Sequence, residues 1–297
     1  MRKMMIKKIV LLATITFVGS FLIYGVVSDK TKFAPVGYDL QMNFANETVP
    51  TQIADVKERL DREMITNINY HTNTTLVIKR ANKAFPIIEP ILAKYGVPDD
   101  FKYLAVIESS LVNAVSPAGA RGVWQFMPAT AKEKGMEVTD EVDERYHLEK
   151  ATEAACKYLL VAKEKFGSWT LAAASYNGGM TGVSNKMKEQ QVSDYYDLLL
   201  TEETSRYVFR ILALKEIMKN ADKYGYMIPG EALYGNLPTR KVVVDATITD
   251  LAAFALTQGI NYKILKIHNP WLRDKKLTVT TGKKYEIEIP TSGYNKQ

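Results

Sequence analysis

The chain has 297 residues, 46% of them hydrophobic, which is enough to bury the core of one large domain or two smaller ones. Its formal net charge of +6 falls to about +2 without the four basic residues that precede an apolar N-terminal run. So small a charge gives little support for nucleic-acid binding. The single cysteine, Cys156, excludes an intrachain disulfide, and its small-residue helical surroundings predict a packed side chain rather than a nucleophile.

Residues 1–28 are predicted to be an N-terminal membrane segment. The uncharged run over 9–27 is about 19 residues long, near the length that crosses a bilayer. No good A-x-A cleavage site follows it, which favours an uncleaved anchor over a removed signal peptide, with the basic end in the cytoplasm. Residues 29–50 are then expected to form a tether that leaves the membrane.

Residues 51–228 are expected to form a helical domain, because no stretch in them alternates like a strand. One helix should begin at Pro86 and end at Gly96, where proline and glycine are typical of a first turn and a C-cap. Asp99 should cap the next helix. The other helices are expected over 53–65, 76–85, 130–134, 149–166, 169–174 and 202–219.

Glu108 is the most informative residue of this domain. It lies in the apolar helical stretch FKYLAVIESSL at 101–111 and stacks over Leu104, because residues four apart share a helix face. Burial makes a carboxyl costly to ionise and raises its pKa, as a general acid near neutral pH requires. A glutamate buried for structural reasons, tied to an arginine or a tyrosine, would give the same pattern.

The stretch after Glu108 favours the catalytic interpretation. A turn-rich segment over 116–122 leads into VWQFMP at 123–128, in which an indole and an amide stand among apolar side chains. Such a mixture is typical of ligand sites. Trp124 followed by Gln125 suits a sugar, since the ring offers a flat apolar face and the amide can bond hydroxyl or N-acetyl groups.

Three further groups of residues have ordinary interpretations. Tyr176 and Asn177 stand beside two glycines and are expected to lie in a turn. Tyr207, taken alone, would be a core aromatic. Asp143 and Arg145 are expected to lie at the solvated, capped start of the helix over 149–166.

After Asn220 a linker leads to a small module over 239–291. It should contain a strand over 241–245, a helix that Thr249 or Asp250 caps, a second helix over 262–267 and a strand over 285–289. This order is similar to a LysM glycan-binding module. ATITDL at 246–251 departs from the Gly-Asp-Ser/Thr-Leu that such modules carry after the first strand. The module's fold is therefore a firmer expectation than glycan binding.

Four motifs follow one another in the helical domain: ES at 108–109, GVWQFMP at 122–128, ASYNGG at 174–179 and ETSRYV at 203–208. In this order they closely resemble the catalytic domain of the soluble lytic transglycosylases, glycoside hydrolase family 23. The resemblance implies a mainly α, goose-lysozyme-like catalytic domain, followed here by the small α+β LysM-like module. It also implies that Asp143 or Arg145 helps to frame a glycan groove.

The family's chemistry needs only one carboxylate. The resemblance implies that Glu108 protonates the β-1,4 oxygen between N-acetylmuramic acid and N-acetylglucosamine, and that the N-acetyl group helps to stabilise the positive charge. The same carboxylate then takes the proton of the muramic C6 hydroxyl, which closes a 1,6-anhydro ring without water. The implied substrate-binding residues are Ser109, Gln125, Met127, Tyr176, Asn177 and Tyr207.

Other chemistries find little support. The three histidines have no ligand-like spacing to Cys156, and no Gly-x-Ser-x-Gly elbow or phosphate loop is present, so no metal or cofactor is expected. The expected partners are peptidoglycan strands and, through the N-terminal segment, the inner membrane, with the enzyme facing the periplasm. Two alternatives remain: a hydrolytic, lysozyme-like muramidase, which uses two carboxylates, and a peptidoglycan-binding scaffold without activity.

Overall fold

The computed structural model describes residues 41–294. The predicted membrane segment and the predicted tether up to residue 40 lie outside them. Within 41–294, no helix combines the length and the apolar character needed to span a bilayer.

A small hairpin begins the described chain. Strands β1 (Asn43–Phe44) and β2 (Glu47–Thr48) pair antiparallel across a two-residue turn with positive φ angles. The Phe44 ring is completely buried, 5.1 Å from the ring centre of Phe101, and the Ala45 amide donates to Asp100 Oδ2 at 2.8 Å. The prediction of a tether over 29–50 is therefore wrong for its last residues, because Phe44 and its neighbours pack into the helical domain.

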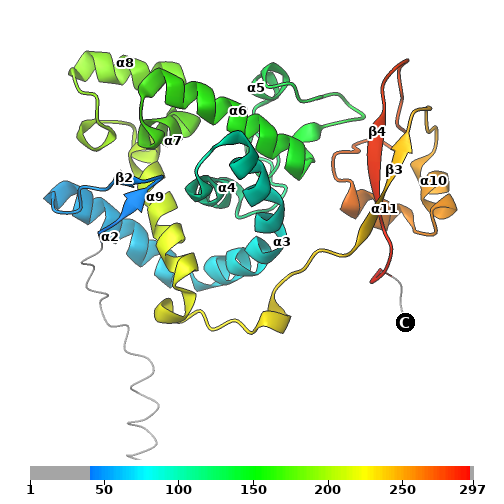
Figure 1. The fold of residues 1–297 in the computed structure, drawn as a ribbon, viewed down its shortest axis with the longest axis horizontal. Helices are drawn as coiled ribbons and strands as arrows, with labels where there is room; N and C mark the ends of the chain where they lie inside the picture. Colours follow the sequence, from blue (N-terminus) through cyan, green and yellow to red (C-terminus); the bar gives the residue numbers. More distant parts are fainter. Residues whose placement is uncertain (1–40, 295–297) are drawn as a thin grey trace, which may run out of the picture. The chain divides into compact units, whose positions relative to one another are not determined.

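The helical domain surrounds the helix that carries Glu108. Figure 1 shows α4 (Lys102–Ser109) in the middle of this part, with α3 (His71–Tyr95), α6 (Leu148–Phe166) and α9 (Glu202–Lys219) around it. The other helices of this domain are α2 (Ala54–Asn69), α5 (Pro128–Glu133), α7 (Trp169–Gly178) and α8 (Met180–Gln190). The mainly helical fold is confirmed, and α2, α6 and α9 match their predicted ranges closely.

The two helices predicted over 76–85 and from Pro86 are one continuous helix, α3, with Pro86 and Pro90 inside it. A proline inside a helix removes the hydrogen bond to the carbonyl four residues earlier. Asn82, Pro86 and Pro90 are all exposed, so water reaches the carbonyls that lose a partner. The predicted end is correct, since Gly96 is the C-cap with φ +69°.

The helix α4 starts later than predicted. Asp99 belongs to a 3-10 turn (Asp99–Phe101) before α4, and its side chain makes no cap hydrogen bond. It forms an ion pair with Lys102 at 2.7 Å instead. The helix ends at Ser109, after which Ser110 and Leu111 both adopt positive φ angles. Glu108 therefore lies in the last turn of α4, where the chain leaves the helix.

The C-terminal module has the predicted order of elements. Strands β3 (Thr239–Val244) and β4 (Tyr285–Pro290) pair antiparallel, with Thr239 opposite Pro290 and Val244 opposite Tyr285. Between them lie α10 (Leu251–Thr257) and α11 (Tyr262–His268). Asp250 caps α10 by accepting the amides of Ala252 and Ala253 at 2.8 and 3.1 Å.

The module's core includes residues of the helical domain. Val142 and Tyr146 are buried in the same apolar cluster as Leu272 and Ile287 of the module. The Asp143 amide donates to the Trp271 carbonyl at 2.9 Å, and further hydrogen bonds connect Glu137 with Lys283 and Glu141 with Thr278. The segment 137–146 is thus shared by the two parts of the chain.

Candidate active site

Glu108 and Tyr207 meet where α4 packs against α9. The Tyr207 hydroxyl donates a short hydrogen bond to Glu108 Oε1, and the Tyr207 side chain is buried. From the same helix, Arg210 Nη2 donates to the Ile107 carbonyl at 3.2 Å, which fixes the guanidinium beside the last turn of α4. The structure thus joins the first and fourth sequence motifs in one site.

The pKa of Glu108 is raised from its ordinary value to about 7. Burial is the largest cause, because the carboxylate loses water that would solvate its charge. The Tyr207 hydrogen bond and the Arg210 charge work in the opposite direction, and the Glu203 charge raises the pKa further. The carboxyl can therefore both hold and release a proton near neutral pH.

Glu203 and Arg210 are site residues that our sequence analysis did not identify. The spacing along the predicted helix over 202–219 could have suggested both, because Glu203 lies four residues before Tyr207 and Arg210 three residues after it. Residues at these spacings share one helix face. The face that presents the tyrosine hydroxyl to Glu108 therefore also presents a carboxylate and a guanidinium near it.

Ser109 and Trp124 are buried and hold the loop that follows α4. Ser109 Oγ donates to the Val123 carbonyl at 2.8 Å. Trp124 is 0% exposed, and its Nε1 donates to Thr152 Oγ1 of α6 at 2.8 Å. The interpretation of Trp124 as a sugar-stacking ring is therefore wrong, because a completely buried ring has no face for a sugar to stack on. With its N–H bonded, the indole is an ordinary core side chain.

Gln125 occupies a strained position at the end of this loop. Its φ is +50°, a region that non-glycine residues adopt at some cost. Its Nε2 donates to the carbonyls of Gly122 at 2.7 Å and Ala114 at 3.1 Å, which holds the loop in this conformation. The amide nitrogen is thus committed to the protein, and its Oε1 is the atom that can accept from a ligand.

Tyr176 and Asn177 lie in the last turn of α7, not in the turn that was predicted for them. The Tyr176 hydroxyl donates to the Trp124 carbonyl at 2.9 Å, and Asn177 Oδ1 accepts from Thr204 Oγ1 at 2.8 Å. Both residues line a cavity of about 440 Å³, together with Gln125 and Met127, whose side chain is 42% exposed. This cavity brings the second and third motifs together.

A second cavity, of about 590 Å³, adjoins α4 on the side of α9. Ile107 and Ser110, the close chain neighbours of Glu108, line it together with Glu203 and Arg210. Glu108 itself lines neither cavity, but its chain neighbours Ile107 and Ser110 line the second one, which therefore lies close to the carboxyl.

Asp143 and Arg145 are buried, so the prediction of a solvated helix start is wrong for them. Arg145 bonds both carboxylate oxygens of Asp143, at 2.8 and 2.7 Å. Its Nη1 donates to the carbonyls of Gly119 and Phe126 at 3.1 and 3.2 Å. The pair therefore supports the loop over 119–126 from behind, and both side chains are only 3% exposed, so a glycan cannot reach them.

Gly122 explains how closely that loop approaches Arg145. Its φ is +83°, and a Cβ atom there would lie 1.8 Å from the Arg145 carbonyl oxygen. Only glycine fits this position without moving the backbone of either segment.

Neither the cysteine nor the potential metal ligands of the described chain form a second reactive site. Burial raises the pKa of the Cys156 thiol to about 12, so it stays protonated and unreactive at neutral pH. Among residues 41–294, no cluster of three or more His, Cys, Asp and Glu side chains could hold a metal ion.

Comparison with known families identifies both parts of the chain. Residues 85–199 match the transglycosylase SLT domain, and residues 240–293 match the soluble lytic transglycosylase C-terminal LysM-like domain. The chain thus joins an SLT domain to a LysM-like domain, as the four motifs and the order of C-terminal elements predicted.

The chain is also similar to particular curated proteins. It is 30% identical over 216 residues to membrane-bound lytic murein transglycosylase D of Escherichia coli K12, and to the protein of the same name in Escherichia coli O6:H1. The similar region covers 68% of this chain and 46% of each relative. The chain therefore spans about half the length of the curated relatives it matches.

Proposed function

We propose that this protein is a lytic transglycosylase that cleaves the β-1,4 bond between N-acetylmuramic acid and N-acetylglucosamine in peptidoglycan and leaves a 1,6-anhydromuramic end. The observation that supports this most directly is Glu108, a largely buried carboxyl with a pKa of about 7 that accepts a hydrogen bond from Tyr207 beside the cavity lined by Ile107 and Ser110. The SLT domain and the similarity to lytic murein transglycosylase D agree with it.

In the first step Glu108 acts as the acid. With a pKa of about 7 it keeps its proton in much of the population at neutral pH and can deliver it to the bridging oxygen. The bond to the muramic C1 then breaks, and the leaving strand ends in a hydroxyl. The substrate's own N-acetyl group stabilises the positive charge at C1, so no second protein carboxylate is required.

In the second step the ionised Glu108 acts as the base. The Tyr207 hydroxyl and the Arg210 charge stabilise the carboxylate that the first step leaves behind. It takes the proton of the muramic C6 hydroxyl while the oxygen bonds to C1. The anhydro ring closes without water, and Glu108 ends the cycle protonated.

The other residues of the site position the loop and the sugar. Met127 and the amide nitrogen of Asn177 line the cavity and are free to contact the glycan, since Thr204 occupies only the Asn177 oxygen. Gln125 offers Oε1. Ser109 and Tyr176 act through the loop carbonyls that they bond. We place the enzyme in the periplasm, anchored by the N-terminal segment in the inner membrane.

A hydrolytic muramidase is the second candidate, and the position of the Glu203 carboxylate near Glu108 favours it. Asp143 and Glu144 are poor candidates for the second carboxylate, because both are buried, Asp143 in an ion pair with the buried Arg145 and Glu144 in one with the half-exposed Lys150. Glu203 is exposed, lines the cavity beside α9 and is close enough to raise the pKa of Glu108. It could orient a water molecule toward C1.

Mass spectrometry of the muropeptides released from purified peptidoglycan distinguishes the candidates. We expect 1,6-anhydromuramic ends from the wild-type chain and no products from Glu108→Gln, which keeps the fold and the shape of the side chain. Reducing ends that disappear in Glu203→Gln would instead establish hydrolysis. Binding of peptidoglycan without any product would favour the scaffold.

A further inference from the structure

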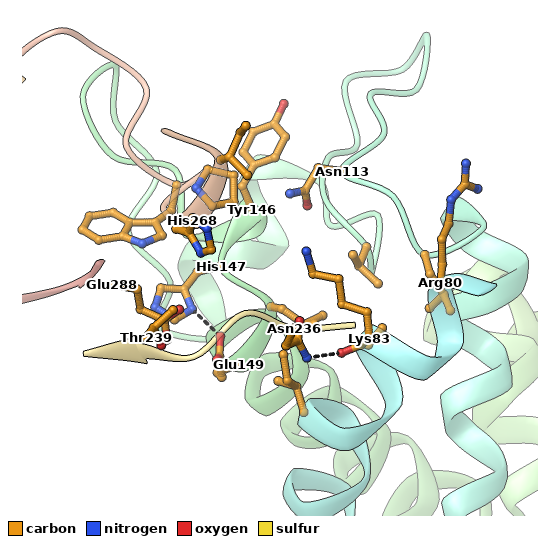
Figure 2. Close-up of a pocket in the computed structure, with 18 of the residues that line it drawn as sticks. Arg80, Lys83, Asn113, Tyr146, His147, Glu149, Asn236, Thr239, His268 and Glu288 are labelled. Carbon is orange, nitrogen blue, oxygen red and sulfur yellow. Dashed lines mark hydrogen bonds and ion pairs between the residues drawn. The ribbon is translucent and has the colours of Figure 1, made fainter. Parts of the chain in front are cut away.

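A third cavity, of about 490 Å³, lies between the helical domain and the LysM-like module. Its walls come from α3, the segment 111–123, the start of α6, the linker before β3 and the module around α11 (Figure 2). The volume is within the usual range of ligand sites, roughly 300–1,000 Å³. None of its lining residues is used in the chemistry proposed for Glu108.

One side of the cavity is cationic. Lys83 extends its amine into the space in Figure 2, near the amide of Asn113. Within 41–294 the Lys83 ammonium forms no ion pair, and Arg80 lies one turn earlier on α3. Burial and the Lys83 charge both lower the pKa of His268, so its imidazole is neutral at pH 7. Lys83 is exposed to solvent and has no ion-pair partner among the described residues, so its charge is available to an anionic ligand in the cavity.

The other side is anionic. Glu149 Oε2 lies 3.0 Å from His147 Nδ1, and Glu288 of the module lines the same wall (Figure 2). The Glu288 carboxylate has no ion pair or hydrogen bond among the described residues. Burial, and then the charge of Glu149, raise the pKa of Glu288. Two carboxylates share this wall, so a cation supplied by a ligand would stabilise both.

The cavity keeps its shape because the linker is tied to α3. The Tyr234 amide donates to the Lys79 carbonyl at 3.2 Å, and Asn236 Nδ2 donates to the Lys83 carbonyl at 2.8 Å. The Lys79 ammonium also lies 4.8 Å from the Tyr234 ring centre. These contacts fix the module's connection beside the charges of α3.

The same cavity is connected to the active site through the chain. Arg80 Nη1 donates to the carbonyl of Ser110, two residues after Glu108, at 3.1 Å. Leu111, Asn113 and Val123 line the cavity, and Val123 accepts the Ser109 hydroxyl. The segment that follows Glu108 thus forms part of the cavity wall, which places a ligand there beside the active-site loop.

We propose that this cavity binds the peptide stem of peptidoglycan, with stem carboxylates at Lys83 and the ammonium of a diamino acid at Glu149 and Glu288. The proposal rests on the proposed function for its choice of ligand. A stem peptide carries free carboxylates and an amine on one short chain, which matches two oppositely charged walls. It would let the enzyme prefer strands that still carry their stems.

The test uses the full chain and two lysine variants of α3. Lys83→Gln removes the unpaired charge, and Lys94→Gln is the matched control, an exposed lysine outside the cavity that pairs with Glu153. The first probe is a synthetic diaminopimelate-containing tetrapeptide, measured by titration calorimetry. We expect Lys83→Gln to weaken its binding about tenfold, as for the loss of one charged hydrogen bond, and Lys94→Gln to match the wild type.

The second probe compares cleavage of stem-bearing strands with strands stripped of peptide by an amidase. We expect the wild type to prefer stem-bearing strands and Lys83→Gln to lose most of that preference, which distinguishes an attached stem from a free peptide. Equal peptide affinity in the two lysine variants, or no preference in the wild type, would overturn the proposal. Failure of the wild type to cleave either strand, with peptide binding intact, would overturn the proposed function alone.

Discussion

Glu108 titrates near neutrality because burial and its charged neighbours act against each other. The carboxyl loses solvation in the last turn of α4, and the Tyr207 hydroxyl and Arg210 restore part of the stability of its charge. The neighbours matter for function as much as the burial does. Without them the carboxyl would remain an acid but would be a poorly stabilised base.

The pH profile of cleavage should reflect this balance. We expect the rate to fall as the pH rises through about 7, because the acid step needs the protonated form of Glu108. Tyr207→Phe removes a hydrogen bond to the carboxylate, so it should move this fall to higher pH as well as slow cleavage. Tyr226→Phe, which removes a buried hydroxyl bonded to the Ile68 carbonyl, is the control. An unmoved profile in Tyr207→Phe would contradict this account.

Stability should also depend on the Glu108 carboxyl. Its pKa is about 7 in the folded chain, above the ordinary value of 4.5, so the folded state binds more protons between these values. The contribution of Glu108 to stability therefore falls as the pH rises through this window. Glu108→Gln has no such pH-dependent loss. The melting temperature of this variant minus that of the wild type should therefore increase from pH 5 to pH 8. A constant difference across these pH values would argue against a raised pKa.

The loop over 119–126 depends on partners that are far from it in the chain. Arg145 bonds two of its carbonyls and pairs with the buried Asp143, Trp124 bonds Thr152 of α6, and Gly122 allows the close approach. These contacts hold Gln125 in its strained conformation beside the cavity. The loop is therefore shaped by α6 and by the segment before it.

Removing Arg145 should be far more costly than removing the neighbouring Arg121. Arg145→Met leaves the buried Asp143 without its main partner, for which we expect a loss of about 3–5 kcal/mol in the free energy of unfolding. The Arg121 side chain is 40% exposed and lies 3.6 Å from Asp143, so Arg121→Met should cost about 0–1 kcal/mol. Urea denaturation of the two variants measures both values. Similar losses in the two variants would refute the assignment of Arg145 as the main partner of Asp143.

The helical domain and the LysM-like module share one apolar cluster, through Val142 and Tyr146. Glu137 and Glu141 add polar contacts to Lys283, Tyr285 and Thr278. A module that is only tethered would melt independently, whereas a shared core couples the two parts.

Calorimetry of the full chain should therefore show a single unfolding transition. Leu272→Ala, which empties a fully buried position bridged to Val142, should lower that transition as a whole, at a cost of about 2–5 kcal/mol. Val243→Ala, at a side chain that is 58% exposed on the module, should change little. A separate early transition that alone responds to Leu272→Ala would mean that the parts unfold independently.

Local sequence patterns were enough to predict the helical class, most helix ranges, the four motifs and the order of elements in the module. Apolar spacing and caps act over a few residues, so the C-cap Gly96 could be assigned, and the cap of α10 narrowed to Thr249 or Asp250, without any tertiary contact. The same local reasoning failed at Pro86 and Asp99, because exposure of the freed carbonyls and a competing ion pair with Lys102 are properties of the folded chain.

The chemistry of the site was decided by contacts between distant residues. Glu108 and Tyr207 are 99 positions apart in the chain. Trp124 is a core residue, and the Thr152 hydroxyl of α6 accepts the hydrogen bond of its indole N–H. Burial and charge–charge distances depend on how α4, α6 and α9 pack, and no local pattern encodes them. The motifs could therefore nominate Glu108 and Tyr207, whereas only the packed structure assigned Asp143 and Arg145 to the support of the loop and showed that Glu203 and Arg210 lie close enough to Glu108 to change its pKa.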